Sequence, residues 1–186
     1  LLPSREWKRK AFSRPQDQVW FPGETVNFGI GQGYFLVTPL QLAHAYATLG
    51  ANGISRPISF LRVDQPVAGE RVLEDRVGRQ LVHMLESVVT PAGTGMRAAI
   101  PGYRVAGKTG TAWKSNAGGY STDRYMAVFG GVAPATHPRL ASVVIIDEPG
   151  AGQYYGGDVA APVFSRVVGG ALRLGHDLVL PGLGFL

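Results

Sequence analysis

Residues 107–112 of the chain read Gly-Lys-Thr-Gly-Thr-Ala, and these residue types at this spacing are compatible with two kinds of chemistry. Counted from Gly102, the segment fits the phosphate-loop pattern G-x-x-x-x-G-K-[ST], in which backbone N–H groups and a helix N-terminus hold phosphates. Counted from Lys108, it is a glycine-interrupted strand that offers one positive charge and two hydroxyls to a carboxylate. The neighbouring residues decide between the two.

The residues on both sides of this segment argue against a phosphate loop. Such a loop follows a strand and opens a helix. Here Pro101 precedes Gly102, where that strand should end, and residues 103–106 inside the supposed loop are strand-like. The segment from Gly110 to Gly119 contains three glycines, which disfavours a helix. We therefore expect no nucleotide site here.

A strand over residues 103–113 explains the same residues better. Thr109 and Thr111 fall on one face of such a strand and Lys108 on the other, because side chains alternate. The glycines beside them let another backbone approach closely, as at an edge strand to which an extended peptide is added. The alternative is an ordinary strand with a solvated lysine.

The composition of the whole chain restricts its class. With 186 residues, 45% of them hydrophobic and 17% charged, the chain is long enough for one domain with a real core. The absence of cysteine excludes disulfides, thiolate metal sites and cysteine nucleophiles. The net charge of +5 comes without basic-aromatic interleaving, so nucleic acid is not expected as a partner. No apolar run is long enough to span a membrane, and the chain reads as an internal piece of a longer protein.

Local signals divide the chain into elements. Thr38 is a natural N-cap, Pro39 suits a first helical position and Gln41 completes a capping box. In chain order we expect an irregular lead-in over residues 1–37, a helix over 38–49, a short strand over 57–63, a helix over 75–89, strands over 103–113, 124–133 and 140–147, a helix over 159–174 and a loose tail over 175–186.

This order of elements predicts an α+β fold, in which an antiparallel sheet carries flanking helices. Each expected helix has a stripe of apolar residues at helical spacing that we expect to face the core. The stripes are Leu42, Ala45, Tyr46 and Leu49; Val77, Leu81, Met84, Leu85 and Val88; and Val159, Val163, Phe164, Val167, Ala171 and Leu174.

Six short motifs, taken in order, resemble the C-terminal part of the transpeptidase domain of class B penicillin-binding proteins, which have a serine β-lactamase-like fold. They are Thr38-Pro-Leu-Gln-Leu-Ala43, Pro91-Ala-Gly-Thr-Gly95, Lys108-Thr-Gly-Thr-Ala112, Gly131-Val-Ala-Pro134, Ile146-Asp-Glu-Pro149 and Tyr154-Tyr-Gly-Gly-Asp-Val-Ala-Ala-Pro-Val-Phe164. Residues 37–174 look most like the division-specific branch of that family, whereas residues 2–34 look more like the elongation-specific branch. Residues 1–186 are thus interpreted as a partial transpeptidase domain.

The resemblance implies a mechanism and a set of roles. In that family a serine of an S-x-x-K motif attacks the penultimate D-Ala carbonyl of a peptidoglycan stem peptide, and an amine of a neighbouring stem accepts the acyl group. The resemblance implies that Lys108 orients the substrate carboxylate and that the hydroxyls of Thr109 and Thr111 bind it. The backbone N–H of Thr111 is implied as an oxyanion donor, and Gly110 as the point of close approach.

Tyr154 and Tyr155 fall where the family often places aromatic residues beside the cleft. Ordinary packing is an equally good explanation of these two tyrosines. The histidines His44, His83 and His137 lack the spacing and acidic neighbours of a metal site, and we expect neither metal nor cofactor.

The sequence departs from the family in one large respect. None of its nine serines has a lysine three positions later, and none begins S-x-N. We therefore expect the chain to be inactive alone and to need the missing N-terminal part of the same protein. A serine β-lactamase or carboxypeptidase relative, and a non-catalytic binding module, are the alternatives.

The same resemblance suggests partners and a location. It implies D-Ala-D-Ala stem peptides as substrate, β-lactam antibiotics as ligands and, as a further partner, a membrane glycosyltransferase of the division or elongation machinery. It also implies the periplasmic face of the bacterial inner membrane, with any anchor outside this chain.

Overall fold

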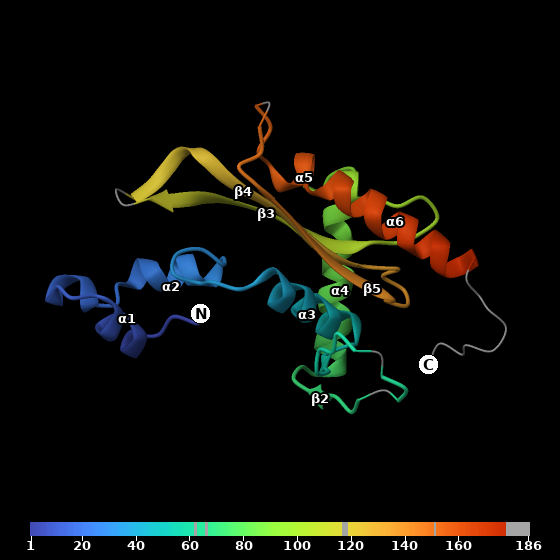
Figure 1. Ribbon diagram of the computed structural model, residues 1–186, viewed down its shortest axis with the longest axis horizontal. Coiled ribbons are helices and arrows are strands. Elements are labelled where there is room, and N and C mark those ends of the chain that lie inside the picture. The colour runs from blue at the N-terminus through green and yellow to red at the C-terminus, as the bar shows by residue number, and fades with distance from the viewer. Residues whose placement is uncertain (62, 66, 117–118, 151, 178–186) are drawn as a thin grey trace. The chain divides into compact units, whose positions relative to one another are not determined.

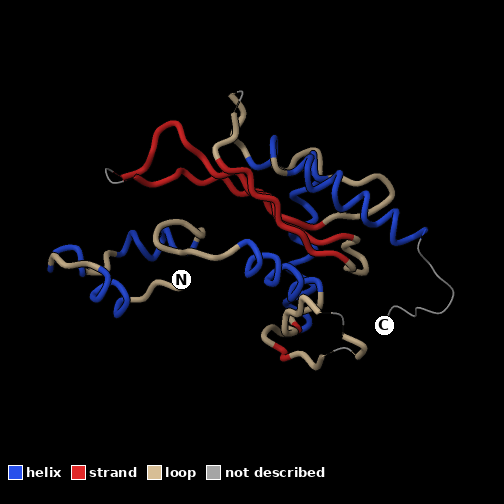
Figure 2. Tube along the Cα trace, viewed as in Figure 1, coloured by secondary structure: helices blue, strands red, loops and turns tan. Residues whose placement is uncertain are grey.

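The computed structural model describes residues 1–61, 63–65, 67–116, 119–150 and 152–177. The chain divides into two compact units, Leu1–Thr38 and Pro39–Leu186, each of which is described by itself. Figures 1 and 2 show helices in both units and the antiparallel strands in the second.

The first unit contains helices where we expected irregular chain, so that expectation is wrong. Helix α1 spans Arg5–Ala11, a 3₁₀ turn spans Pro15–Gln18 and helix α2 spans Pro22–Gly29. The hydroxyl of Ser4 accepts the N–H of Trp7 at 3.0 Å and so caps α1. These helices are only about two turns long, which is too short for a helical period of apolar residues to be recognised. The proline, glycine and basic residues of the segment therefore led us to expect irregular chain.

The first unit is organised around the buried ammonium of Lys8, whose residue is only 2% exposed. The Lys8 Nζ forms an ion pair with Glu24 and donates to the carbonyl of Val19 at 2.6 Å. It also lies over three aromatic rings, those of Phe12, Phe21 and Tyr34, at 5.9, 5.0 and 5.7 Å from their centroids. A buried charge is tolerated here because one carboxylate, one carbonyl and three ring faces replace its water.

The second unit is built on a three-stranded antiparallel sheet in the order β3–β4–β5. Strand β3 spans Ala106–Asn116, β4 spans Gly119–Ala133 and β5 spans Leu140–Asp147. The last two strands form the expected hairpin, and the β-branched run in β5 suits a pleated, half-buried surface. Strand β3 lies at an edge of the sheet as far as the structure describes the chain.

Helices cover both faces of this sheet, which confirms the α+β fold (Figure 1). On one face, Phe129 of β4 packs edge-on against Phe164 of helix α6, which spans Ala161–Asp177 after the short helix α5 at Gly156–Val159. On the other face, helix α3 at Pro39–Gly50 and helix α4 at Asp75–Glu86 pack over a smaller core. Its buried members are Val82, Ala106 and Val132.

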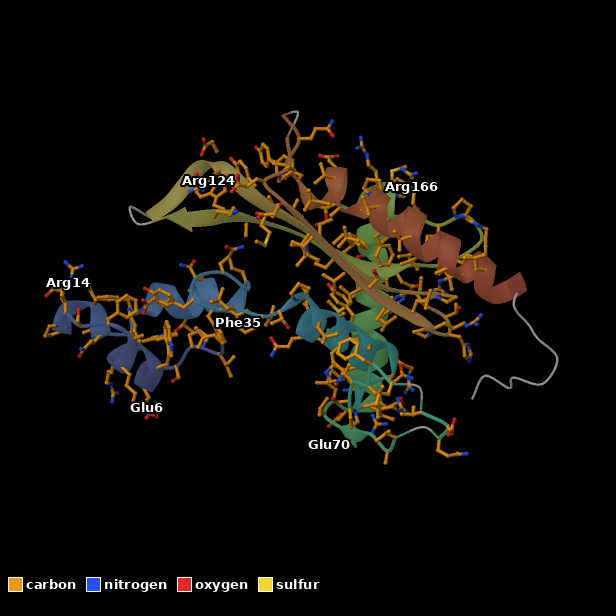
Figure 3. All side chains as sticks on the ribbon, in the orientation of Figure 1. Glu6, Arg14, Phe35, Glu70, Arg124 and Arg166 are labelled. Atoms are coloured by element: carbon orange, nitrogen blue, oxygen red, sulfur yellow. The ribbon has the colours of Figure 1, made fainter. Side chains whose placement is uncertain are left out.

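The expected helices are present, but the prediction of which of their residues face the core is partly wrong. On α6 the core contains Ala161, Phe164, Val168 and Leu172, whereas four members of the expected stripe are exposed: Val163, Val167, Ala171 and Leu174. Arg166 lies on the outward side of the same helix (Figure 3). Both stripes of α6 are apolar, so periodicity alone does not say which one meets the sheet.

The other two helices show smaller shifts of the same kind. On α4, Val82 is buried and Met84 is 66% exposed, and Gly78 lies close against the backbone of Asn52. On α3, Thr48 is buried and Ala45 is exposed. The hydroxyl of Thr48 donates to the carbonyl of His44 at 2.9 Å, which satisfies this polar group inside the helix.

The expected strand over residues 57–63 is also wrong where the structure describes it. Two short strands pair instead, β1 at Ile54–Ser55 and β2 at Glu70–Arg71. Phe60 between them is 87% exposed, so its apolar character reflects no buried face. Helix α6 continues to Asp177, beyond the expected start of a loose tail, and the remainder of that tail lies outside the described residues.

Candidate functional site

Strand β3 presents the lysine-threonine-glycine segment at the edge of the sheet. Lys108 is exposed, and its Nζ donates to the carbonyl of Thr109 at 3.0 Å. No carboxylate of the described residues pairs with it. After Thr109 the chain continues as β3 rather than as a helix, which is the arrangement of an edge strand and not of a phosphate loop. Lys108 therefore carries a charge that a substrate carboxylate can pair with.

The loop at residues 91–95 lies directly beside this strand. The hydroxyls of Thr94 and Thr109 are 2.8 Å apart and share a hydrogen bond. The backbone of α5 approaches the same loop, since a Cβ added to Gly157 would lie 2.0 Å from the carbonyl oxygen of Thr94. Three segments that are distant in the sequence thus meet around Thr109.

The hydroxyl of Thr111 fixes the start of α5 to the strand. It accepts the backbone N–H of Gly156 at 3.1 Å. A Cβ on Gly156 would lie 2.3 Å from the carbonyl oxygen of Val128 and 2.5 Å from that of Gly110. Only glycine can bring the α5 backbone this close to β3 and β4 without moving it.

Aromatic side chains continue the face of β3 that carries Thr109 and Thr111. The ring of Tyr154 stacks on that of Tyr125 at 4.1 Å, and the ring of Tyr155 lies 4.5 Å from that of Tyr154. Trp113 pairs with Tyr125 across β3 and β4, with ring centroids 6.5 Å apart. We call Trp113, Tyr125, Tyr154 and Tyr155 the aromatic row.

Two members of this row remain open to solvent. Trp113 is 57% exposed and Tyr155 is 56% exposed. The hydroxyl of Tyr154 donates to that of Tyr155 at 3.4 Å, and this hydrogen bond raises the pKa of Tyr154 above the usual tyrosine range. The hydroxyl of Tyr154 therefore stays neutral at physiological pH and can exchange hydrogen bonds with a ligand.

An ion cluster ties together the far ends of β3 and β5. The Nζ of Lys114 donates to Glu148 at 2.7 Å and to Asp147 at 2.9 Å. These hydrogen bonds, with that to Glu148 the stronger, raise the pKa of the Lys114 ammonium. The second lysine of the strand is thus neutralised, which leaves Lys108 as the cation of β3 without an acidic partner among the described residues.

The structure therefore brings all the expected site residues onto one strand and the segment that leads into α5. Sequence reasoning missed three contributors, Thr94, Tyr125 and Gly156. Motif spacing gave weak signals for Thr94 and Gly156, which lie in the quoted motifs, and none for Tyr125. Among the described residues, no group of three or more His, Asp or Glu side chains is placed to hold a metal.

This combination of features defines a class of protein. An exposed lysine-threonine-glycine edge strand, backed by a glycine-led C-terminal helix on a helix-flanked antiparallel sheet, is the architecture of the penicillin-recognising transpeptidases. The chain belongs to the penicillin binding protein transpeptidase domain family, whose model matches residues 8–169.

Named relatives agree with this assignment. The chain is 54% identical over 159 residues to the peptidoglycan D,D-transpeptidase FtsI of Escherichia coli K12, a match that covers 86% of this chain and 27% of that protein. It is 39% identical over 170 residues to the probable peptidoglycan D,D-transpeptidase PenA of Neisseria meningitidis serogroup A, covering 91% of this chain and 27% of that one.

A solved structure gives the same result. The apo transpeptidase domain of penicillin-binding protein 3 from Burkholderia pseudomallei is similar with a TM-score of 0.76 and 40% identity. The match covers 93% of this chain and 52% of that domain. The chain spans about a quarter of the length of the two curated relatives named above. Among the described residues, no helix has the length and apolar character needed to cross a membrane.

Proposed function

We propose that this chain is the substrate-binding, C-terminal part of a peptidoglycan D,D-transpeptidase that cross-links stem peptides by serine acyl transfer in its parent protein. The relatives that carry this name in Escherichia coli and Neisseria meningitidis support the activity. The single observation that carries the proposal is the open edge of β3, where Lys108 is exposed and has no acidic partner in the described chain. Beside it, the hydroxyls of Thr109 and Thr111 are hydrogen-bonded to Thr94 and Gly156.

The geometry suggests how a stem peptide would bind. An extended peptide can add to the free edge of β3 through backbone hydrogen bonds, next to Gly110, which has no side chain. The ammonium of Lys108 would then pair with the terminal carboxylate of D-Ala-D-Ala. The hydroxyl of Thr109 is hydrogen-bonded to that of Thr94, and the hydroxyl of Thr111 accepts the N–H of Gly156, and we propose that both hydroxyls also bind that carboxylate.

The backbone of Thr111 is proposed to stabilise the developing oxyanion. Backbone N–H groups of an edge strand point alternately to the neighbouring strand and to the open edge. Thr109 and Thr111 share one such direction, and the Thr109 carbonyl accepts a bond from the Lys108 ammonium. The N–H of Thr111 would donate to the substrate carbonyl oxygen as it becomes negative.

The acyl-transfer step itself needs a nucleophile that this sequence does not contain. In the proposed reaction a serine oxygen forms a bond to the D-Ala carbonyl carbon, and the bond to the leaving D-Ala nitrogen breaks as that nitrogen takes the serine proton through a base. The nitrogen of an amine of a second stem peptide then bonds to the acyl carbon, the bond from that carbon to the serine oxygen breaks, and the amine proton passes through the base to the serine oxygen. We propose that the serine, its lysine and the S-x-N motif come from the N-terminal part of the same protein.

The remaining partners follow from this assignment. β-Lactams would acylate the same serine with their carboxylate on Lys108, and Tyr154 and Tyr155 would border the cleft. We propose that the parent protein acts at the periplasmic face of the inner membrane, with a division- or elongation-type membrane glycosyltransferase as its partner.

Labelling with a fluorescent penicillin tests the proposal. The parent protein should form a covalent adduct seen by intact mass, and Lys108→Ala in that protein should slow its formation, whereas Lys114→Ala should act less because Asp147 and Glu148 neutralise that lysine. The 186-residue chain alone should gain no penicilloyl mass. An adduct on the isolated chain, or equal acylation of the Lys108→Ala parent, would contradict the proposal.

A further inference from the structure

The first unit has a surplus of positive charge that falls on two residues. Its five basic side chains are Arg5, Lys8, Arg9, Lys10 and Arg14, and its three acidic ones are Glu6, Asp17 and Glu24, so 5 − 3 leaves two positive charges. Ion pairs use every acid: Lys8 with Glu24, Lys10 with Glu6 and Arg14 with Asp17. All of residues 1–38 are described, and Arg5 and Arg9 have no acidic or hydrogen-bonded partner among the described residues.

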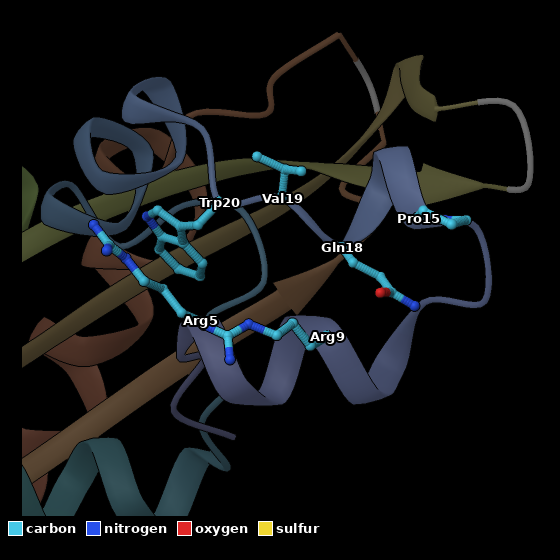
Figure 4. Close-up of a pocket in the computed structure, with 6 residues that line it drawn as sticks. All are labelled: Arg5, Arg9, Pro15, Gln18, Val19 and Trp20. Carbon is cyan, nitrogen blue, oxygen red and sulfur yellow. The ribbon is translucent and has the colours of Figure 1, made fainter.

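These two unpaired arginines line the same hollow. Arg5 and Arg9 lie one turn apart on α1, so their side chains share a face of the helix. The hollow measures about 460 Å³, and Figure 4 shows both arginine side chains extending along it from α1. By contrast, Glu6 and Arg14, which belong to paired charges, project from other parts of this unit (Figure 3).

Besides the two arginines, the lining of the hollow comes from residues 15–20, which hydrogen bonds hold in place. Pro15, Val19 and Trp20 contribute to it, together with Gln18. The indole N–H of Trp20 donates to the hydroxyl of Thr25 at 2.9 Å, and the amide of Gln18 donates to the carbonyl of Phe12 at 2.8 Å. The hollow thus sets two guanidiniums against a fixed aromatic ring.

We propose that this hollow binds an acidic peptide segment, whose carboxylates pair with Arg5 and Arg9 and whose neighbouring apolar side chain packs on Trp20. The planar fork of a guanidinium matches a carboxylate with two parallel hydrogen bonds. A simple oxyanion such as phosphate would use the two arginines and leave the wall of Pro15, Val19 and Trp20 uncovered. The hollow belongs to the first unit and shares no residue with strand β3, so the proposal does not rest on the function proposed for that strand.

The acidic segment is proposed to be a part of the same polypeptide, because the chain spans only 27% of the length of its relative from Escherichia coli. A separate protein as the occupant is the alternative outcome that the experiment distinguishes.

The test is fluorescence anisotropy with the 186-residue chain and a fluorescein-labelled peptide Asp-Leu-Asp-Leu-Asp. The matched peptide Asn-Leu-Asn-Leu-Asn serves as the uncharged control. The double variant Arg5→Gln/Arg9→Gln should bind the acidic peptide at least about 10-fold more weakly, because it loses charge-assisted hydrogen bonds that solvent partly screens. The double variant Lys10→Gln/Arg14→Gln also removes two positive charges from the first unit, but not those of Arg5 and Arg9. It should bind the acidic peptide within about 2-fold of the unchanged chain.

Two further measurements define the outcome. Trp20→Ala should weaken binding of the acidic peptide, while circular dichroism shows that the helices are retained. Inorganic phosphate should compete only poorly with the peptide for the hollow. Failure of the acidic peptide to bind, equal loss in the two double variants, or binding that ignores Trp20 and is displaced by phosphate would each overturn the proposal. With the intact parent protein, loss of peptide binding would identify its own polypeptide as the source, and retained binding a separate protein; both results presuppose the site in the isolated chain.

Discussion

The hydroxyl of Thr111 and the backbone N–H of Gly156 are joined by a hydrogen bond of 3.1 Å across 45 positions of sequence. This bond links the proposed substrate-binding strand to the segment that carries Tyr154 and Tyr155. The hydrogen bond therefore gives the strand and the aromatic row a direct connection, so a substitution at Thr111 is expected to affect both.

Gly156→Ala should destabilise the second unit. The new Cβ would lie 2.3 Å from the carbonyl oxygen of Val128, so either α5 or the strands must shift, and overpacking of this kind costs about 1–3 kcal/mol. Urea unfolding of the 186-residue chain measures the loss. Gly150→Ala is the matched control, since a Cβ there meets no atom within 4 Å. Equal midpoints for the two variants would show that α5 does not press on β4.

Substitutions at Thr111 separate the two proposed roles of this residue in the parent protein. Thr111→Ser keeps the hydroxyl and the N–H, so acylation by a penicillin should change little. Thr111→Val keeps the N–H and removes the hydroxyl; the loss of one charge-assisted hydrogen bond predicts a rate lower by about 10- to 150-fold. The measurement is the second-order acylation rate.

The same Thr111→Val change leaves the N–H of Gly156 without its acceptor, which should cost the isolated chain about 1–3 kcal/mol of stability. Unfolding and acylation must therefore be measured on the same variants. If Val and Ser acylate at equal rates, the hydroxyl does not bind the carboxylate.

Lys8→Met should unfold the first unit locally. The change leaves the Glu24 carboxylate, 18% exposed, without its cation, and breaking one partner of a buried pair costs about 3–5 kcal/mol. Hydrogen exchange of amides in α1 and α2 reports the effect. Lys10→Met, at a side chain 77% exposed, should leave exchange nearly unchanged. Because Glu24→Gln removes the charge and keeps an acceptor for the backbone N–H of Phe21, Lys8→Met/Glu24→Gln should recover protection, and no recovery would argue against the ion pair as the cause.

Alkaline pH should destabilise the second unit through Tyr46. Burial raises the pKa of Tyr46 to about 12 in the folded chain, above the value of about 10 for an unfolded tyrosine. The neutral ring is therefore favoured by folding, so its contribution is complete below about pH 10 and is lost as pH rises through about 12. The stability of Tyr46→Phe should fall less over this interval when both chains are unfolded in urea. Parallel pH profiles would exclude the role of this hydroxyl.

The local chemistry of the sequence predicts most of the second unit. The turn between β4 and β5 contains two prolines, and the run of β-branched residues in β5 has strong strand preference, so both strands follow from nearby residues. Helix α3 begins at Pro39, where capping signals place it. These signals act within a few residues and need no tertiary contact.

The predictions that were wrong concern residues whose environment is set by partners distant in the sequence. Val163 and Val168 are both apolar residues of α6, and only the position of the sheet determines that Val168 is the buried one. Lys8 sits in a basic run that suggests solvent, yet the chain returns with Phe21, Glu24 and Tyr34 to enclose it. Sequence spacing does not encode such returns.

The residues of the candidate site also fall into two groups, those predicted from a local motif and those that depend on strand pairing. The motif predicts Lys108, Thr109 and Thr111 because they are consecutive in the chain and share a strand. Tyr125 comes from the next strand and is found only through the register, which places it opposite Trp113. Cross-strand partners of this kind require the pairing to be known first.

The sheet of the second unit ends at β3 on one side and at β5 on the other among the described residues. Strand β5, Leu140–Asp147, is half-buried over most of its length and pairs with no described strand on its outer side. Two copies of the isolated chain can pair along this side, and the paired sheet can grow further from its other ends. Self-association should thus be an intermolecular reaction whose rate rises with protein concentration, and dilution during refolding would protect the chain more effectively than a longer refolding time.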